Sequence, residues 1–193
     1  MTGLSAPWSI AFVGETALIS ERETGVIWEL LDAGSLREIA RIDDLAPTGE
    51  GGLLGLAAGE DERLYAYSSG SNGNRVQRFE LAGAAGSYGL GAADTILDGL
   101  PYAGFHNGGR IAFGPDGMLY VCVGDATEGE RAQDLGVLSG KILRRRQMAR
   151  SRLTTHSLAR SCSASAIGTC RASIGRPTAR CSPASSVRTP GTS

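Results

Sequence analysis

Short apolar runs separated by tight turns are the feature that most limits how residues 1–144 can fold. Apolar residues recur at every second position in residues 8–13, and further short runs follow at 17–20 and 26–30. A turn that contains glycine separates each run from the next. Runs of this length suit strands rather than helices, and turns about every 8–12 residues are typical of a sandwich, a barrel or a propeller. The sequence therefore predicts an all-β fold.

The same unit of strand, turn and strand recurs further along the chain. A second copy covers 52–79 and a third covers 109–125. The pattern I-A-F, turn, L-Y at 111–120 echoes I-A-F, turn, A-L-I at 10–19. A repeat of about 40–50 residues, each a small antiparallel sheet, favours a β-propeller, with a sandwich as the alternative. The only short helix that we expect lies near 130–137.

The net charge of −1 is the sum of two unlike parts. Residues 1–144 hold all 20 acidic residues and 10 basic ones, which gives 10 − 20 = −10. Residues 145–193 hold nine arginines, no Asp, Glu or Lys and no aromatic residue, which gives +9. The chain as a whole lacks the basic excess of a nucleic-acid binder, and no apolar run reaches the roughly 20 residues of a membrane span. The residues after Met1 show no signal peptide.

His106 is the first candidate for chemistry. It is the only histidine in residues 1–144, and it lies in the glycine-rich loop F-H-N-G-G-R at 105–110 that leads into a strand. A histidine there can titrate near neutral pH, and the two glycines allow a flat ligand to approach the backbone. The alternative is a loop histidine that only caps a turn.

Asp125 is the second candidate. If residues 110–114 and 118–124 form a hairpin, Asp125 lies near the His106 end of the hairpin. A carboxylate there could orient the imidazole and raise its basicity, which is the arrangement of a general base. The alternative is a turn aspartate that bonds its own backbone.

Three motifs resemble the soluble PQQ-dependent sugar dehydrogenases, the glucose/sorbosone or aldose sugar dehydrogenase family. They are G-E-G-G-L-L-G-L-A at 49–57, H-N-G-G-R-I-A-F-G-P-D-G-M-L-Y-V-C-V-G-D at 106–125, and Q-D…L-S-G-K-I-L-R at 133–144. The opening L-S-A-P-W-S-I-A-F at 4–12 is also similar to that family. The resemblance implies that 1–144 forms about three blades of a six-bladed propeller.

The resemblance also implies roles for single residues. His106 falls on the family's general base, which takes the proton of the sugar C1 hydroxyl while hydride passes to the quinone. Asp125 falls on the carboxylate that supports this base. The resemblance further suggests Glu50, Asn107 and Arg110 as cofactor-binding residues. Gln133 and Asp134 fall near the substrate mouth.

The cofactors that the resemblance implies are PQQ and calcium, with most of their ligands beyond the matching part and no metal ligand within it. The partners are a sugar and an external electron acceptor, without nucleic acid or a membrane span. Members are commonly exported, which leaves room for a signal peptide upstream of Met1. Two departures, Phe105 where some members have Asp and Glu50 where some have Gln, favour the aldose dehydrogenase branch. The alternative function is a propeller that binds a ligand without catalysis, which need not keep His106 and Asp125 together.

Residues 145–193 do not continue the resemblance. Their composition is typical of GC-rich coding DNA read in the wrong frame. Reading the third base of each codon with the first two of the next turns Met148-Ala149 into Gly, and 165–173 then permits G-H-R-N-V-Q-G-L, a motif the family has in this region. We therefore interpret 145–193 as a low-order tail produced by a frameshift near 144–147. The scattered arginines argue against a nucleic-acid arm, and the cysteine spacings do not fit a zinc site.

Overall fold

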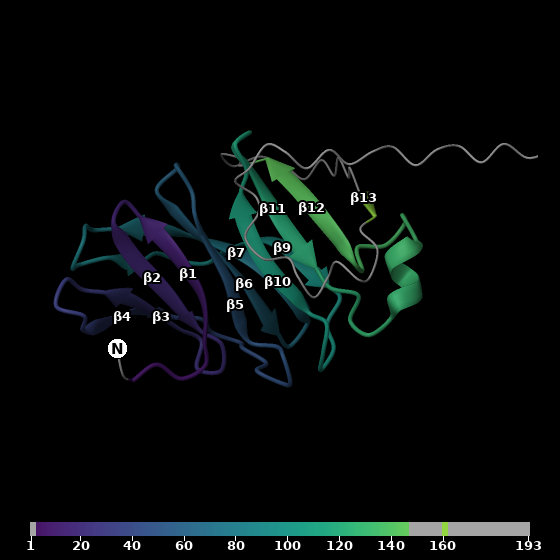
Figure 1. The fold of residues 1–193 in the computed structure, drawn as a ribbon, viewed down its shortest axis with the longest axis horizontal. Helices are drawn as coiled ribbons and strands as arrows, with labels where there is room; N and C mark the ends of the chain where they lie inside the picture. The colour runs from purple at the N-terminus through teal and green to yellow at the C-terminus, as the bar shows by residue number, and fades with distance from the viewer. Residues whose placement is uncertain (1–2, 147–159, 162–193) are drawn as a thin grey trace, which may run out of the picture.

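Three antiparallel sheets follow one another along the chain in the computed structural model, which describes residues 3–146 and 160–161 (Figure 1). The first sheet has the order β1-β2-β3-β4. Its strands are β1 (Pro7–Val13), β2 (Thr16–Glu21), β3 (Val26–Leu30) and β4 (Leu36–Arg41). Each strand pairs with the next in sequence, so the sheet is a simple meander like one blade of a propeller.

The second sheet repeats the meander and then widens. It runs through β5 (Leu53–Ala58), β6 (Arg63–Gly70) and β7 (Gly73–Ala82), after which β8 (Gly89–Leu90) and β9 (Asp94–Leu100) both pair with β7. The third sheet has the order β10-β11-β12-β13. Its strands are β10 (Gly108–Phe113), β11 (Met118–Val123), β12 (Lys141–Arg146) and β13 (Arg160–Ser161).

The predicted all-β fold is confirmed. The predicted helix near 130–137 is limited to a short 3-10 turn, Gly129–Gln133, in the loop between β11 and β12. Apart from residues 145–146 in β12 and 160–161 in β13, the predicted tail lies outside the described residues. The described part of the chain contains no helix whose length and apolar character would let it span a bilayer.

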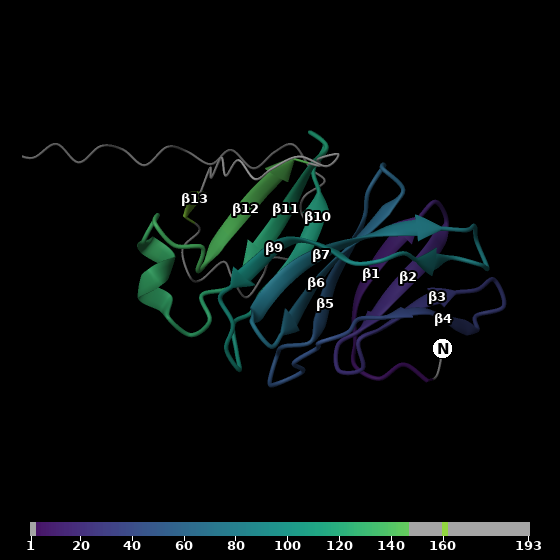
Figure 2. The same ribbon diagram turned by 180° about the vertical axis from the view of Figure 1, so that it is seen from behind.

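The core lies between the sheets, because β5, the inner strand of the second sheet, packs against both the first and the third sheet. Leu53 and Leu56 of β5 pack with Leu18 and Ile27 of the first sheet. Leu54, between them in sequence, packs instead with residues of the third sheet such as Ile111. Successive side chains of a strand point to opposite faces, and an irregularity in the pairing of β5 between Leu53 and Leu56 lets both of these face the first sheet, so one strand joins two apolar clusters. The three sheets therefore hold together as one row, which Figure 2 shows from behind.

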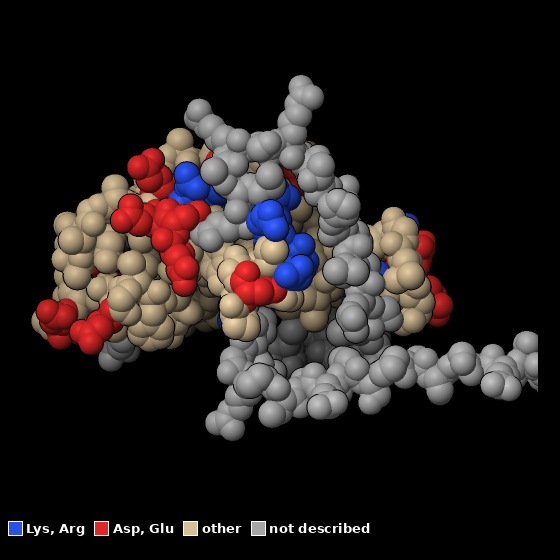
Figure 3. Space-filling model, turned by 90° about the horizontal axis from the view of Figure 1, so that it is seen from above, with Lys and Arg blue, Asp and Glu red and all other residues tan. Residues whose placement is uncertain are grey.

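Charged side chains occupy the outside of this row. Figure 3 shows acidic and basic side chains on the upper face, with several acidic ones toward the side of the first sheet. On the third sheet, Asp116, in the β10–β11 turn, pairs with Arg144 of β12 at 2.9 Å between Oδ2 and Nη2. The backbone amide of Met118 and the hydroxyl of Tyr120 also bond Asp116, and together these contacts outweigh desolvation and lower the pKa of its carboxyl. Asp116 therefore stays ionised on the outside of the third sheet.

Gly55 marks the closest approach between the second and third sheets. A Cβ at this position would lie 2.2 Å from the carbonyl oxygen of Gly109 and 3.1 Å from the backbone nitrogen of Ile111. Backbone atoms cannot move aside as a flexible side chain can. A side chain at position 55 would therefore push β5 and β10 apart.

We predict that Gly55→Ala lowers the free energy of unfolding by about 1–3 kcal/mol, the usual range for overpacking a core. The matched control is Gly89→Ala on β8, where an added Cβ meets nothing within 4 Å. Urea unfolding of the two variants measures the difference. Equal losses in both variants would show that the contact between β5 and β10 does not limit the packing.

Candidate active site

The loop that ends at His106 meets the end of β11, because β10 and β11 form the predicted hairpin. Gly108 pairs with Val123, and Ile111 pairs with Val121. The residue after β11 is Gly124, where a Cβ would lie 1.7 Å from the carbonyl oxygen of His106. Only glycine allows the two backbone segments to come this close. The hairpin thereby places Asp125 beside His106.

His106 and Asp125 form a hydrogen-bonded pair. The distance between His106 Nδ1 and Asp125 Oδ1 is 3.0 Å. The Asp125 side chain is 8% exposed, whereas the His106 side chain is 59% exposed. An ionised carboxylate can only accept hydrogen bonds, so in the neutral imidazole this contact requires the proton on Nδ1 and leaves the lone pair on Nε2. The pair thus presents a basic nitrogen at the surface, supported from below by a carboxylate.

The backbone of His106 is fixed from two sides. Its φ angle is +59°, in the left-handed region that a residue with a side chain adopts only when its surroundings require it. Its N–H donates to Glu50 Oε2 at 2.9 Å, and its carbonyl oxygen accepts from the amide of Ala126 at 3.1 Å. The first contact comes from the loop before β5 and the second from the residue after Asp125. Loops next to two separate sheets therefore fix the backbone that carries the imidazole.

Asn107 lies beneath the loop rather than at its surface. It is 1% exposed, and its Oδ1 accepts from the amide of Ala103 and from Asn74 Nδ2, both at 3.1 Å. Its carbonyl oxygen accepts from the Tyr67 hydroxyl at 2.9 Å. Burial raises the pKa of that hydroxyl, so Tyr67 stays protonated and remains a donor. The structure thus shows Asn107 ordering the segment that carries His106.

Arg110, Gln133 and Asp134 lie apart from the His106 pair. The Arg110 guanidinium stacks on Trp8, with 4.1 Å between its central carbon and the centroid of the ring. This contact joins β10 of the third sheet to β1 of the first. Gln133 and Asp134 are exposed in the loop between β11 and β12, and Asp134 Oδ1 accepts from the amide of Gly136 at 2.7 Å. They share this loop with Asp125, but no hydrogen bond or ion pair among the described residues joins either of them to His106.

The sequence alone did not reveal three supporting groups. These are the Glu50 carboxylate on the His106 amide, the Tyr67 hydroxyl under Asn107, and the buried ammonium group of Lys141. Tyr67 and Lys141 fall in strands, where a sequence gives no sign of which loop they touch. Within residues 3–146 and 160–161, no group of three or more His, Cys, Asp or Glu side chains is placed to hold a metal ion.

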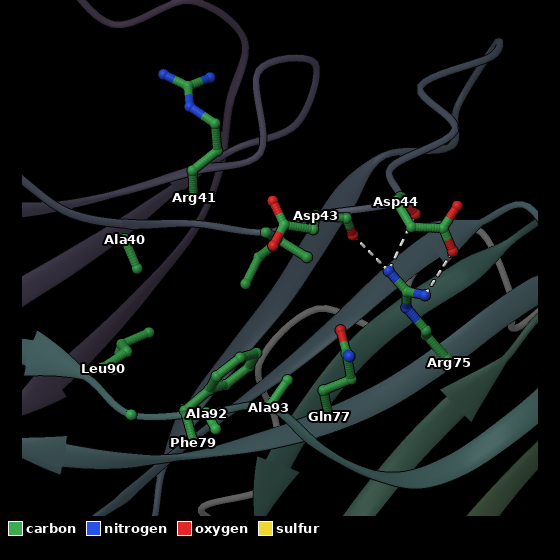
Figure 4. A pocket seen from close by; sticks show the side chains of 12 residues that line it. Ala40, Arg41, Asp43, Asp44, Arg75, Gln77, Phe79, Leu90, Ala92 and Ala93 are labelled. Carbon is green, nitrogen blue, oxygen red and sulfur yellow. Dashed lines mark hydrogen bonds and ion pairs between the residues drawn. The ribbon is translucent and has the colours of Figure 1, made fainter.

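A separate hollow lies between the first and second sheets and contains none of the predicted site residues (Figure 4). Arg75 crosses its rim, with Nη1 2.8 Å from Asp44 Oδ2 and Nη2 2.7 Å from the carbonyl oxygen of Asp43. Hydrogen bonds from Ser71 and from Arg75 lower the pKa of the Asp44 carboxyl. The described lining of the hollow has no histidine or cysteine.

We predict that Asp125→Ala changes the tautomer of His106. In a chain with His156→Gln, His106 is the only histidine. At about pH 8.5 an imidazole is neutral, and ¹⁵N chemical shifts of labelled histidine report which nitrogen carries the proton. We expect Nδ1–H in the chain with Asp125. In Asp125→Ala we expect a shift of about tenfold toward Nε2–H, because one charge-assisted hydrogen bond is lost.

The control for this prediction is Glu128→Ala, which removes an exposed carboxylate three residues further along the same loop. Glu128 pairs with Arg131, and in the described part of the chain no hydrogen bond or ion pair joins its side chain to His106. It should leave the tautomer unchanged. An unchanged tautomer in Asp125→Ala would mean that the carboxylate does not orient the imidazole.

Comparison with known proteins gives one consistent family. The family described as glucose/sorbosone dehydrogenase matches residues 4–151. The aldose sugar dehydrogenase YliI of Escherichia coli K12 is 29% identical over 159 residues, which are 73% of this chain and 41% of that protein.

Two solved structures show the same likeness in three dimensions. The PQQ-bound aldose sugar dehydrogenase of Streptomyces coelicolor has a TM-score of 0.69 and 40% identity, over 76% of this chain and 46% of that one. The apo form of the soluble aldose sugar dehydrogenase of E. coli has a TM-score of 0.57 and 25% identity, over 73% of this chain and 44% of that one. The chain therefore spans less than half the length of each of these relatives.

Proposed function

Because the chain belongs to the glucose/sorbosone dehydrogenase family, we propose that its gene encodes a PQQ-dependent dehydrogenase that oxidises an aldose at C1 to the lactone. The observation that carries this proposal is the pair of His106 and Asp125, with an exposed Nε2 behind which a carboxylate is buried. A propeller that only binds a ligand has no need of a base held in this way. The PQQ-bound relative of Streptomyces coelicolor supports the choice of cofactor.

The reaction requires a base because the hydroxyl oxygen at C1 must lose its proton while C1 itself loses a hydride. His106 Nε2 takes the proton, and Asp125 stabilises the imidazolium that forms through the Nδ1–H bond. When bound, PQQ supplies the acceptor for the hydride. The sugar must therefore sit with its C1 hydroxyl within hydrogen-bond distance of Nε2.

The described residues fit the sugar side of this site better than the quinone side. Asn107 is buried with its amide under the loop, and Arg110 is stacked on Trp8. Glu50 is exposed beside His106, but its carboxylate would repel the carboxylates of PQQ. We therefore propose that the groups that hold PQQ and calcium, and the contact with the external electron acceptor, belong mainly to the part of the relatives that this chain does not match.

We further propose that residues 145–193 are read out of frame. The family match ends at residue 151, near the proposed break, and the shifted frame permits the G-H-R-N-V-Q-G-L motif at 165–173. The charge supports the same reading, since nine arginines without a single acidic residue follow a part with charge −10. If the frame shifts there, the blades that the relatives have beyond the matched part are not made, and a sheet edge stays open. We expect the 193-residue chain to be catalytically inactive and poorly stable.

We predict that sequencing the gene across codons 140–150 reveals one added or missing base. Correcting it should yield a longer protein that reduces PQQ with an aldose, measured with an artificial electron acceptor in the presence of calcium. The 193-residue chain, assayed in parallel, should show no turnover. A clean read of the gene, or robust sugar oxidation by the 193-residue chain, would overturn the proposal for the tail.

A further inference from the structure

Lys141 is a buried lysine at the start of β12 whose partners are all backbone carbonyls. It is 1% exposed, and its Nζ donates to the carbonyl oxygens of Ser139 at 2.8 Å, Ala132 at 2.9 Å and Arg131 at 3.3 Å. None of the ion pairs found among residues 3–146 includes it. The three acceptors match the three N–H groups of an ammonium.

This arrangement is costly for a residue that would only fill space. Removing an ammonium group from water costs free energy, and here no carboxylate offsets it. A leucine or methionine would fill the same volume without that cost. What Lys141 adds is directed hydrogen bonds to two places in one loop, the 3-10 turn around Ala132 and the loop end at Ser139.

That loop begins at Asp125. Its two ends are joined where the amide of Gly140 donates to the carbonyl oxygen of Gly124 at 2.9 Å, and Ala132 is fully buried. The Asp125 Oδ1 that bonds His106 also accepts from the amide of Thr127 at 3.0 Å. The carboxylate is therefore aimed by the first residues of the loop.

Those first residues have a strained backbone. Ala126 has a φ of +50° and Thr127 a φ of +69°. The left-handed conformation is unfavourable for residues other than glycine, so the surrounding contacts must impose it on both residues. The contacts of Lys141 lie on the other side of the same loop, and they restrain it where it folds back toward Asp125.

We propose that Lys141 is a positioning residue for the His106 site. Its ammonium group holds loop 126–139 in the conformation that aims Asp125 at His106 and presents Gln133 and Asp134 at the loop surface. The catalytic meaning of this role rests on the proposed function, whereas the geometric coupling between Lys141 and the imidazole does not.

The test uses the 193-residue chain with His156→Gln and the ¹⁵N signals of His106 at about pH 8.5, where an imidazole is neutral. In Lys141→Met, which keeps the volume and removes all three donors, we expect the ratio of Nδ1–H to Nε2–H to fall about tenfold. In Lys141→Gln, which keeps two donors, we expect a smaller fall. The matched control Arg131→Met removes a cation from the exposed side of the same loop and should leave the ratio unchanged.

Amide spectra of the first sheet, recorded on the same samples, separate a local effect from loss of the fold. The proposal requires that the signals of β1–β4 stay in place while the tautomer changes. It is overturned if the ratio in Lys141→Met equals that of the control. It is also overturned if both lysine variants lose the signals of β1–β4, because Lys141 would then support the whole fold. No quinone or sugar is present, so failure of the proposed function would not alter these outcomes.

Discussion

The close packing of β5 against β10 is the constraint on which the site depends. Gly55 lets the two inner strands approach until backbone lies against backbone, and Leu54 fills the space beside them. This contact fixes the start of β10 relative to the loop before β5. The Glu50 carboxylate can then reach the amide of His106 from one sheet, while Asp125 reaches its imidazole from the next. The orientation of the His106 imidazole is thus a consequence of how two sheets pack.

The strained conformation of His106 follows from the same arrangement. A φ of +59° persists because both backbone groups of His106 are bonded to neighbouring segments. Tyr67 and Asn107 lie beneath it, and both are buried. The Tyr67 hydroxyl donates to the carbonyl oxygen of Asn107, which supports the loop from below. Such preorganisation would suit the base that we propose, since little reorganisation is then needed when a proton moves.

Much of the fold and part of the site could be predicted from the sequence. The alternation at 8–13 and the hairpin around 115–117 depend on neighbouring residues, and the structure has β1 and the β10–β11 pair there. The predicted hairpin also indicated that His106 and Asp125 lie close together, because antiparallel pairing brings the start of one strand beside the end of the other. Local patterns do not give contacts between distant segments. For that reason the sequence did not indicate β4 or β9, which lack clear alternation, or the reach of Lys141 back into its loop.

The central claim is that His106 is the base of an aldose dehydrogenase. The most direct measurement is the rate at which an aldose reduces bound PQQ in the frame-corrected protein, followed by stopped-flow absorbance in wild type and in His106→Ala. The account predicts that His106→Ala still binds PQQ but reduces it about 10²–10⁴-fold more slowly, the usual contribution of a general base. Reduction at the wild-type rate in His106→Ala would contradict the account.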